Sequence, residues 1–465
     1  MMPRAVDLAV IGAGPAGMAA ALRACSLGLS VAVLDEQPSP GGQIYRAVTQ
    51  GSTLPANVLG PDYHSGRDLA ERFAACGAHY RPGALIWQIQ NDTLDFTTSY
   101  GPDSVQAKRI VVASGAMERP FPVKGWTLPG VMTAGAAQIM LKTSATAIPD
   151  AVFVGSGPLL YLVVAQYIRA GVPIALVLDT TPRGARLRAA RHLPGALRAA
   201  SYLGKGLGLL REIRRAGIRV VSHVEDLSIE GEGAVTGLRW RTRDGEEAAS
   251  ATQVFLHQGV IPNVNLAMAL GCRQLWDESQ RCWRPELDRW GRSSLPNVFV
   301  AGDAGGIAGA LSARLAGDLA AIAVAAELDA LDDAAAERLA APLFASQRRD
   351  KAVRPFIEEL YRPAAQFRAP SDDAVIICRC EEVTRGAIAA AVAEKCAGPN
   401  QLKSFTRCGM GPCQGRMCGH SVSELMSALT GRQPAEIGYL RIRMPVKPVT
   451  LGDIAGERSK GSYAS

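Results

Sequence analysis

The stretch DLAVIGAGPAGMAAALRACSLGLSVAVLDE, residues 7–36, decides the fold that we expect for this chain. An apolar run, residues 8–11, leads into a glycine-rich turn, and the alanine-rich segment that follows has the composition of a helix ending near Leu27. A second apolar run, residues 31–34, ends at two acidic residues. This order of strand, turn, helix and strand predicts a βαβ unit that binds a dinucleotide.

The turn supplies what a bound pyrophosphate requires. Gly12 permits the tight turn, Gly14 lets the phosphates approach the backbone, and Gly17 lets the helix pack on the strand. The helix N-terminus offers free N–H groups to the phosphates. The alternative is a glycine-rich turn without a ligand. The residues expected to bind the nucleotide are Gly12, Gly14, Pro15, Ala16, Gly17 and Asp35, with Glu36 as a substitute for Asp35.

Three later segments favour FAD over NAD at this first site. They read PGGQ at 40–43, IVVASGA at 110–116 and NVFVAGD at 297–303. In this order they resemble the segments that surround the flavin in thioredoxin-reductase-like flavoproteins. The resemblance implies that Asp303 binds the ribityl chain. The residues expected beside the flavin are Gly42, Gln43, Ser114, Gly115, Gly302 and Asp303.

A second copy of the βαβ pattern spans residues 151–179. Its candidate nucleotide residues are Gly155, Gly157 and Asp179, but Leu160 stands where the third glycine belongs. A working pyridine-nucleotide site, an adenine nucleotide held without hydride chemistry and an empty structural copy all remain open. Two such units predict an α/β two-dinucleotide-binding-domain flavoprotein of the thioredoxin-reductase-like type, with a small, mainly helical C-terminal domain.

Cysteine spacing separates this chain from disulfide reductases of the same fold. No CxxC or CxxxxC pair occurs before Cys378, so no redox disulfide of that kind lies beside the flavin. Besides Cys396, which we interpret as an isolated buried thiol, five cysteines crowd into residues 378–418 instead. That distribution predicts a metal site in a reducing compartment rather than a disulfide framework.

The crowded cysteines form a CxC pair followed by a Cx4C pair. Four thiolates hold either tetrahedral zinc or an iron–sulfur cluster, and a neighbouring flavin favours the redox-active [2Fe-2S] cluster. Cys408 also makes a Cx4C pair with Cys413, so five cysteines compete for four places. Between the pairs, Thr384 is a suitable N-cap for a helix that runs to about Val392.

Composition restricts the class of protein further. The formal net charge of +7 comes without a compact basic helix, which argues against nucleic acid as a partner. No apolar run approaches the ~18 residues of a transmembrane helix. We expect a cytoplasmic protein, with peripheral attachment to the inner membrane left open.

Domain boundaries follow from these motifs. The predicted order is an FAD-binding domain, an inserted second dinucleotide-binding-like domain, the return of the first domain, a linker, a [2Fe-2S] domain and a tail. These parts span residues 1–120, 121–280, 281–340, 341–373, 374–432 and 433–465.

The motifs together resemble one family over nearly the whole chain. They are PGGQIYR at 40–46, GWTLPGVMTAGAAQ at 125–138, GSGPLL at 155–160, CRCEEVT at 378–384 and GMGPCQGRMC at 409–418. They are similar to the FAD-containing alpha subunits of multi-subunit amino-acid dehydrogenases. This family includes the A subunit of opine oxidase and the alpha subunits of D-hydroxyproline dehydrogenase and dye-linked proline dehydrogenase. The B subunit of hydrogen cyanide synthase is a relative.

The resemblance implies a partner and further cofactors. In this family a glycine- or sarcosine-oxidase-like beta subunit with its own FAD oxidises the substrate, and several members carry FMN at the subunit interface. The C-terminal module resembles the bacterioferritin-associated-ferredoxin-like [2Fe-2S] domain. Because such relatives commonly lack a cysteine where Cys408 stands, the ligands that the resemblance implies are Cys378, Cys380, Cys413 and Cys418.

The expected function is therefore electron relay from that partner to an external acceptor. One alternative is a self-contained NADH-dependent ferredoxin reductase with a fused cluster, and another is a flavin-binding subunit with a structural zinc docking module. No histidine pair has metal spacing, and we expect a structural role for His257. We assign no acid–base catalytic residue.

Overall fold

In the computed structural model, which describes residues 4–50 and 54–455, the first sheet is built around the N-terminal βαβ unit. β1 (Ala5–Ile11), α1 (Pro15–Ser26) and β2 (Val31–Asp35) confirm the predicted strand, helix and strand. The order of the sheet is β3-β2-β1-β6-β5-β4, and β19 also pairs with β6. The other strands are β3 (His79–Pro82), β4 (Leu85–Gln90), β5 (Thr93–Thr98), β6 (Gly101–Val112) and β19 (Val298–Val300).

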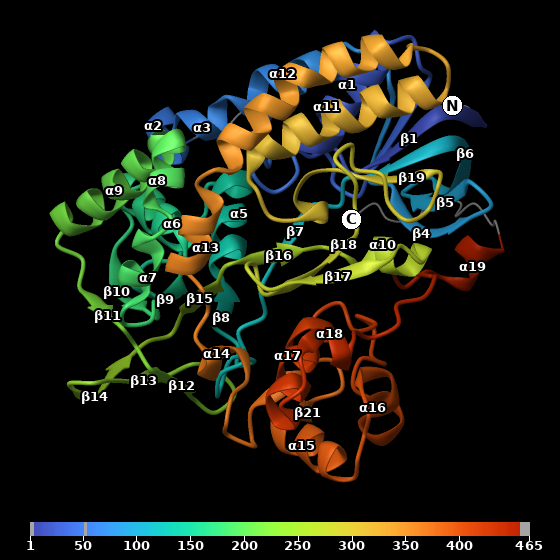
Figure 1. Ribbon diagram of the computed structural model, residues 1–465. Coiled ribbons are helices and arrows are strands. Elements are labelled where there is room, and N and C mark those ends of the chain that lie inside the picture. The colour runs from blue at the N-terminus through green and yellow to red at the C-terminus, as the bar shows by residue number, and fades with distance from the viewer. Residues whose placement is uncertain (1–3, 51–53, 456–465) are drawn as a thin grey trace.

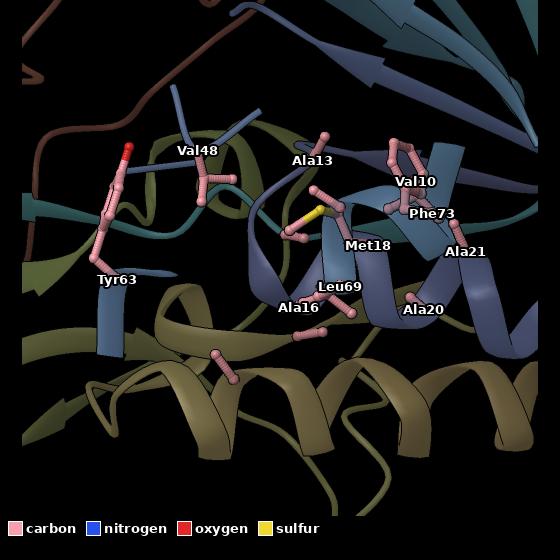
Figure 2. Close-up of a cluster of buried hydrophobic side chains, with 14 of the residues drawn as sticks. Val10, Ala13, Ala16, Met18, Ala20, Ala21, Val48, Tyr63, Leu69 and Phe73 are labelled. Carbon is pink, nitrogen blue, oxygen red and sulfur yellow. The ribbon is translucent and has the colours of Figure 1, made fainter. Parts of the chain in front are cut away.

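Of two long helices that come late in the chain, the first lies beside α1 and the second packs against the first (Figure 1). They are α11 (Ala310–Glu327) and α12 (Asp333–Lys351). Figure 2 shows Ala16 and Ala20 on the side of α1 that faces α11. A Cβ atom added at Gly317 of α11 would lie 2.0 Å from the Ala16 carbonyl oxygen, so the two helices touch backbone to backbone. The short helices nearby are α2 (Ala56–Leu59), α3 (Pro61–His64) and α4 (Gly66–Ala74).

A second parallel sheet forms from the inserted unit, in the order β11-β10-β9-β15-β8. Its strands are β8 (Val131–Thr133), β9 (Ala151–Ser156), β10 (Ile174–Asp179), β11 (Val220–Ser222) and β15 (Val254–Gln258). The helices of this domain are α5 (Ala134–Ser144), α6 (Pro158–Arg169), α7 (Ala185–Ala190), α8 (Leu193–Ala196), η1 (Leu197–Ala199) and α9 (Ala200–Arg215). Because β19 joins the first sheet after this insertion, the second sheet interrupts the first in the sequence.

Smaller sheets connect and extend the two domains. β7 (Ala116–Glu118) pairs with β16 (Val260–Pro262), so both crossings between the domains lie side by side. A three-stranded sheet extends the second domain, and a two-stranded hairpin extends the first. These strands are β12 (Asp226–Glu230), β13 (Gly237–Thr242), β14 (Gly245–Ser250), β17 (Gln274–Asp277) and β18 (Cys282–Pro285). The remaining short helices of this region are α10 (Asn265–Leu270) and η2 (Gly302–Gly305).

The cysteine-rich part folds as a small helical module, drawn in orange to red in Figure 1. Its elements are β20 (Ile376–Cys378), β21 (Val383–Thr384), α15 (Arg385–Ala393), α16 (Pro399–Thr406), α17 (Gly419–Thr430) and α18 (Pro434–Ile437). The side chain of Thr384 accepts a hydrogen bond from the backbone N–H of Ala387, which confirms the predicted N-cap of α15. The tail beyond the module ends in α19 (Leu451–Ile454).

The module is continuous with the rest of the protein. One hydrophobic cluster contains first-sheet residues such as Leu94 and Val298 together with Ile377 and Val422 of the module. The expected linker, residues 341–373, contains α13 (Arg354–Leu360) and α14 (Ala365–Arg368) and packs on the second domain through ion pairs and a buried phenylalanine. The segment is therefore an ordered connection.

Across residues 4–50 and 54–455, none of the helices combines the length and hydropathy needed to cross a bilayer.

The contact between α1 and α11 can be tested at Gly317. Since an added methyl group would meet the backbone of α1, we expect Gly317→Ala to lower the free energy of unfolding by about 1–3 kcal/mol or more. Urea denaturation followed by circular dichroism measures this change.

Gly206 provides the matched control. It lies inside α9, where an added Cβ would meet no atom within 4 Å. Gly206→Ala should raise stability by roughly 0.5–1 kcal/mol, because alanine restricts the unfolded chain more than glycine does. Equal effects of the two substitutions would contradict the close helix contact.

Candidate functional site

The predicted nucleotide residues converge at the carboxyl edge of the first sheet. Ile11 of β1 and Val300 of β19 are both in register with Val112 of β6. The three segments that follow these strands therefore begin at the same edge. Crevices at this edge are where open α/β sheets bind ligands.

Close backbone contacts explain the glycines of the first turn. A Cβ atom at Gly12 would lie 2.6 Å from the Ala113 carbonyl oxygen, and one at Gly17 would lie 1.8 Å from the Gly12 oxygen. No side chain caps α1 at Gly14. The first N–H groups of α1 are thus available to an anion, which fits the pyrophosphate of a dinucleotide.

The predicted flavin loop lies directly against this turn. A Cβ atom at Gly42 would lie 2.9 Å from the Gly14 Cα atom. The loop is held from the other side by Lys142, whose Nζ atom donates to the carbonyl oxygens of Gln43 at 3.0 Å and Ile44 at 2.9 Å. Burial, together with the charge of Arg46, lowers the pKa of Lys142 to about 7. Sequence reasoning missed Lys142, since no local motif marks it.

The two candidate ribose acids have different surroundings. Asp35 is buried and accepts hydrogen bonds from the backbone N–H groups of Ala13 and Gln37, both at 3.1 Å. Burial raises the pKa of Asp35. Glu36 instead forms an ion pair with Lys447 of the C-terminal tail. Asp35 therefore belongs to the nucleotide turn, whereas Glu36 attaches the tail to this domain.

Ser114 and Asp303 lie on the other two segments of the site. The Ser114 hydroxyl donates to the Asn263 carbonyl oxygen at 3.0 Å. Asp303 accepts from the backbone N–H groups of Ala308 at 2.9 Å and Gly309 at 3.1 Å, just before α11 begins. The carboxylate of Asp303 is thus fixed between η2 and the N-terminus of α11. The arrangement fits a flavin dinucleotide on all three segments.

The second nucleotide site lacks the third glycine of its turn, and its candidate acid accepts a hydrogen bond from the backbone. Leu160 is fully buried where a third glycine would allow closer packing. Asp179 is buried and accepts the backbone N–H of Thr181 at 2.8 Å. Tyr161 lies against Asp179, and burial followed by the charge of Asp179 raises the pKa of the Tyr161 hydroxyl well above its usual value.

His257 lies beside this second turn and has the structural contacts expected of it. Its Nδ1 atom lies 2.7 Å from Oε1 of Glu118, and its Nε2 atom would lie 3.5 Å from a Cβ added at Gly157. The other carboxylate oxygen of Glu118 accepts the backbone N–H of Gly135 at 3.0 Å, near the start of α5. The pair therefore orients the second turn relative to the crossing strand β7.

The cysteine module holds a compact group of thiols. The Sγ atoms of Cys378, Cys408 and Cys418 all lie within 4.8 Å of one another, and the three residues are buried. Hydrogen bonds from the Cys408 and Cys418 thiols, followed by backbone N–H groups that include that of Gly409, lower the pKa of Cys378 to about 2. Cys380 and Cys413 form a neighbouring, more accessible pair. Soft thiolate donors so arranged fit a thiophilic metal centre.

Cys408 was predicted not to be a ligand, but the structure places its thiol with those of Cys378 and Cys418. Arg407 ends α16 in the left-handed conformation, with φ of 61°, and Gly409 follows with φ of 81°. The chain therefore reverses at Cys408, and its side chain packs with Cys378 and Cys418 instead of standing apart. The helix stop at Arg407 and the glycine after it were the sequence signals for this reversal.

A buried carboxylate joins the module to the flavin domain. Glu424 of α17 lies 2.7 Å from Arg368, 3.1 Å from Arg281, 3.6 Å from Arg119 and 3.1 Å from His420. Burial alone would raise the pKa of Glu424, but the hydrogen bond from His420 and the arginine charges outweigh it and hold the pKa well below its usual range. The contacts reach across three separate segments of the chain.

Aromatic rings surround this network on the hairpin side. The ring of Trp276 stacks on His420 with centroids 6.0 Å apart and an interplanar angle of 15°. The Trp283 indole donates to the Ser423 hydroxyl at 3.3 Å. The β17–β18 hairpin thus packs against α17, which begins directly after Cys418.

Comparison with known proteins agrees with this architecture. A family model described as pyridine nucleotide-disulphide oxidoreductase matches residues 6–317, and one described as the sarcosine oxidase A3 domain matches residues 375–458. The A subunit of an opine oxidase from Rhizobium meliloti is 44% identical, over 97% of this chain and 87% of its own length. This chain belongs to the family of opine oxidase A subunits. It is a flavin-dependent oxidoreductase, and its family supports FAD as its cofactor.

A more distant sequence relative and two solved structures can also be compared with this opine oxidase homologue. The HcnB subunit of hydrogen cyanide synthase from Pseudomonas aeruginosa is 32% identical over 95% of this chain and 96% of its own length. Among solved structures, L-proline dehydrogenase from P. horikoshii has a TM-score of 0.70 at 20% identity, over 97% of this chain and 79% of that chain. Thioredoxin reductase from T. acidophilum has a TM-score of 0.52 at 21% identity, over 70% of this chain and 100% of that chain. These two structures confirm the predicted fold class.

The charge network makes a testable prediction for the docking of the module. Glu424→Gln would leave buried arginines without their counter-charge, so we expect it to lower the free energy of unfolding by about 3–5 kcal/mol. Because the folded-state pKa of Glu424 is depressed, its contribution is present above the ordinary pKa of 4.5 and is lost as the pH falls toward the folded-state value. Urea denaturation at several pH values measures both effects.

Glu394→Gln is the matched control, because Glu394 is exposed on the same module at the end of α15. It should change stability by less than about 0.5 kcal/mol. A Glu424→Gln protein as stable as this control would show that the network does not dock the module.

Proposed function

We propose that this chain is the FAD and [2Fe-2S] electron-transfer subunit of a multi-subunit amino-acid or opine dehydrogenase, of the D-hydroxyproline, proline or opine type. It receives electrons from a substrate-oxidising partner and passes them to an external acceptor. The observation that carries this proposal is a cysteine-rich module that is docked on a flavin domain through a shared hydrophobic core and buried charge. An iron–sulfur cluster beside a flavin can accept one electron at a time from it, whereas zinc has no redox chemistry.

The relatives support an assembly with another subunit. Three of them, at 43% or 44% identity, are A subunits of opine oxidase, and the match to the sarcosine oxidase A3 domain points to the same class of enzyme. We propose a beta subunit of the glycine- or sarcosine-oxidase type, with its own FAD, as the partner that binds and oxidises the substrate. We also propose FMN at the interface between the subunits.

Each nucleotide has proposed contacts in this chain. The first turn and the N-terminus of α1 hold the pyrophosphate of FAD, Asp35 binds its ribose, and Asp303 binds its ribityl chain. The second domain holds an adenine nucleotide without hydride chemistry at Gly155 and Gly157. The buried Leu160, which stands in place of the third glycine, supports this over a working NADH site.

The proposed cluster ligands are Cys378, Cys380, Cys413 and Cys418. Bound there, the cluster supplies a one-electron acceptor. Cys408 competes with this set, because its Sγ atom lies with those of Cys378 and Cys418. A structural zinc site is the alternative for the same thiols, because four thiolates also bind tetrahedral zinc.

Metal content distinguishes these assignments. Full-length protein prepared without oxygen should contain about two iron atoms and two sulfides per chain, the composition of [2Fe-2S]. Cys418→Ser should lose most of the iron, because it removes a ligand that both candidate sets share. Cys408→Ser should keep it, and Cys272→Ser, which changes a buried thiol of the flavin domain, is the control. Elemental analysis and the spectrum of the reduced protein measure the result.

Two results would contradict the assignment. If the protein contained zinc but no iron or sulfide, the thiols would hold a structural zinc ion, and the module would serve for docking instead of electron transfer. Loss of iron in Cys408→Ser, with retention in Cys380→Ser or Cys413→Ser, would move the cluster onto the buried thiol group.

Turnover with and without the partner tests the function itself. Co-expressed with its beta subunit, the chain should reduce an artificial acceptor when an amino acid or opine is supplied, and the chain alone should show little turnover. Anaerobic NADH should leave the flavin of the chain oxidised, because Leu160 stands where the third glycine of the second turn belongs. Bleaching of the flavin by NADH alone would establish the ferredoxin-reductase alternative.

A further inference from the structure

A cleft lies on the module where the tail passes over the cysteine loop. It has a volume of about 520 Å³ and is lined by Lys403 of α16, by Met410 and Gln414 of the loop that follows Cys408, and by Arg441 and Arg443 of the tail. Sites for small molecules have volumes of this order. The cleft is separate from both dinucleotide turns.

Three cations face this cleft and no carboxylate lines it. Across the described residues, Lys403, Arg441 and Arg443 make no ion pair with an acidic side chain. Lys403 is partly buried, and its Nζ atom reaches only the Arg441 carbonyl oxygen, at 3.5 Å. Burial, followed by the charge of Arg443, lowers the pKa of Lys403.

Two acidic residues elsewhere on the module have other partners. Glu381 pairs with Arg407 at 2.9 Å, and Glu424 is enclosed by the arginines of the docking network. Like charges gathered in a hollow without a counter-charge repel each other. The thiols of Cys418 and Cys408, when ionised, oppose the lowering of the Lys403 pKa, but no acidic side chain of the described residues pairs with Arg441 or Arg443. An anion from outside the chain can therefore join this group.

Hydrogen bonds and close packing fix the backbone that forms the walls of the cleft. Asn400 donates from its side chain to the Tyr439 carbonyl oxygen at 3.1 Å and accepts the backbone N–H of Arg441 at 2.7 Å. Leu440 is buried so closely against the loop that a Cβ atom at Gly409 would lie 2.8 Å from it. The tail alternates exposed Arg441, buried Ile442 and exposed Arg443, so both arginines stand on the open side. The backbone that carries Arg441 and Arg443 is thus fixed against α16 and the cysteine loop.

We propose that this cleft binds the phosphate monoester group of a small molecule, with Lys403, Arg441 and Arg443 as its charged contacts. Planar guanidinium groups match phosphate oxygens in a bidentate way, and a lysine adds a point charge. The apolar side chain of Met410 on the same wall suits an organic body attached to the phosphate. A free phosphate ion shares the charge chemistry but would not use that wall. This site does not depend on the proposed electron-transfer function.

Titration calorimetry on the full-length protein at constant ionic strength tests the proposal, with inorganic phosphate and phenyl phosphate as probes. Because a phosphate can also bind at a dinucleotide turn, only binding that the cleft variants weaken is assigned to the cleft. We expect both probes to bind, and Lys403→Met and Arg441→Gln to weaken binding about tenfold each, the typical loss for one charge-assisted hydrogen bond. Lys395→Met is the matched control, since Lys395 is an exposed lysine of the same module outside the cleft.

The outcomes separate the sources of the ligand. Tighter binding of phenyl phosphate than of inorganic phosphate supports a phosphorylated organic ligand, as proposed. Equal affinities, or binding of inorganic phosphate only, would overturn the organic part. Binding that Lys395→Met weakens as much as Lys403→Met, or competition by poly-glutamate as strong as by phenyl phosphate, would overturn the site in favour of general charge attraction or an acidic protein surface. A thermal melt of each variant with its flavin bound checks that the fold is intact.

Discussion

The burial of one carboxylate, Glu424, among arginines from three parts of the chain is the interaction on which the arrangement of the two functional parts depends. Arg119 comes from the crossing between the domains, Arg281 from the hairpin and Arg368 from the connecting helix α14. A charge buried in this way is stable only with its partners in place. The module is consequently fixed against the flavin domain in one orientation and does not swing on a linker.

This rigidity has a consequence for the chemistry that the chain can support. The docking keeps the thiol module at one place on the flavin domain. The shared hydrophobic cluster, the stacked Trp276 and His420, and the tail that pairs Lys447 with Glu36 all restrain the same docking. The fold therefore joins a nucleotide-binding platform to a thiol cluster as one body, in agreement with the placement of the chain among flavin-dependent oxidoreductases.

The sequence was sufficient to predict those features that depend on residues within one short segment. The glycines of the first turn were predictable because Gly12 and Gly17 each meet a backbone oxygen at less than van der Waals distance. The N-cap at Thr384 and the strands around residues 151–179 were predictable for similar reasons, since capping and apolar runs act within a few residues. The damaged third position, Leu160, was visible directly.

Contacts between distant segments were not predictable in this way. Cys408 looked superfluous by comparison with similar modules, yet the left-handed residue before it and the glycine after it place its thiol with Cys378 and Cys418. Lys142 and Glu424 carry no motif, because their partners lie on other segments. The sequence by itself determined the two nucleotide folds and the presence of a thiol module, since backbone sterics and residue chemistry act locally. Only the tertiary structure decided which thiols meet, which charges are buried and where unpaired cations gather, because these depend on how separate segments pack.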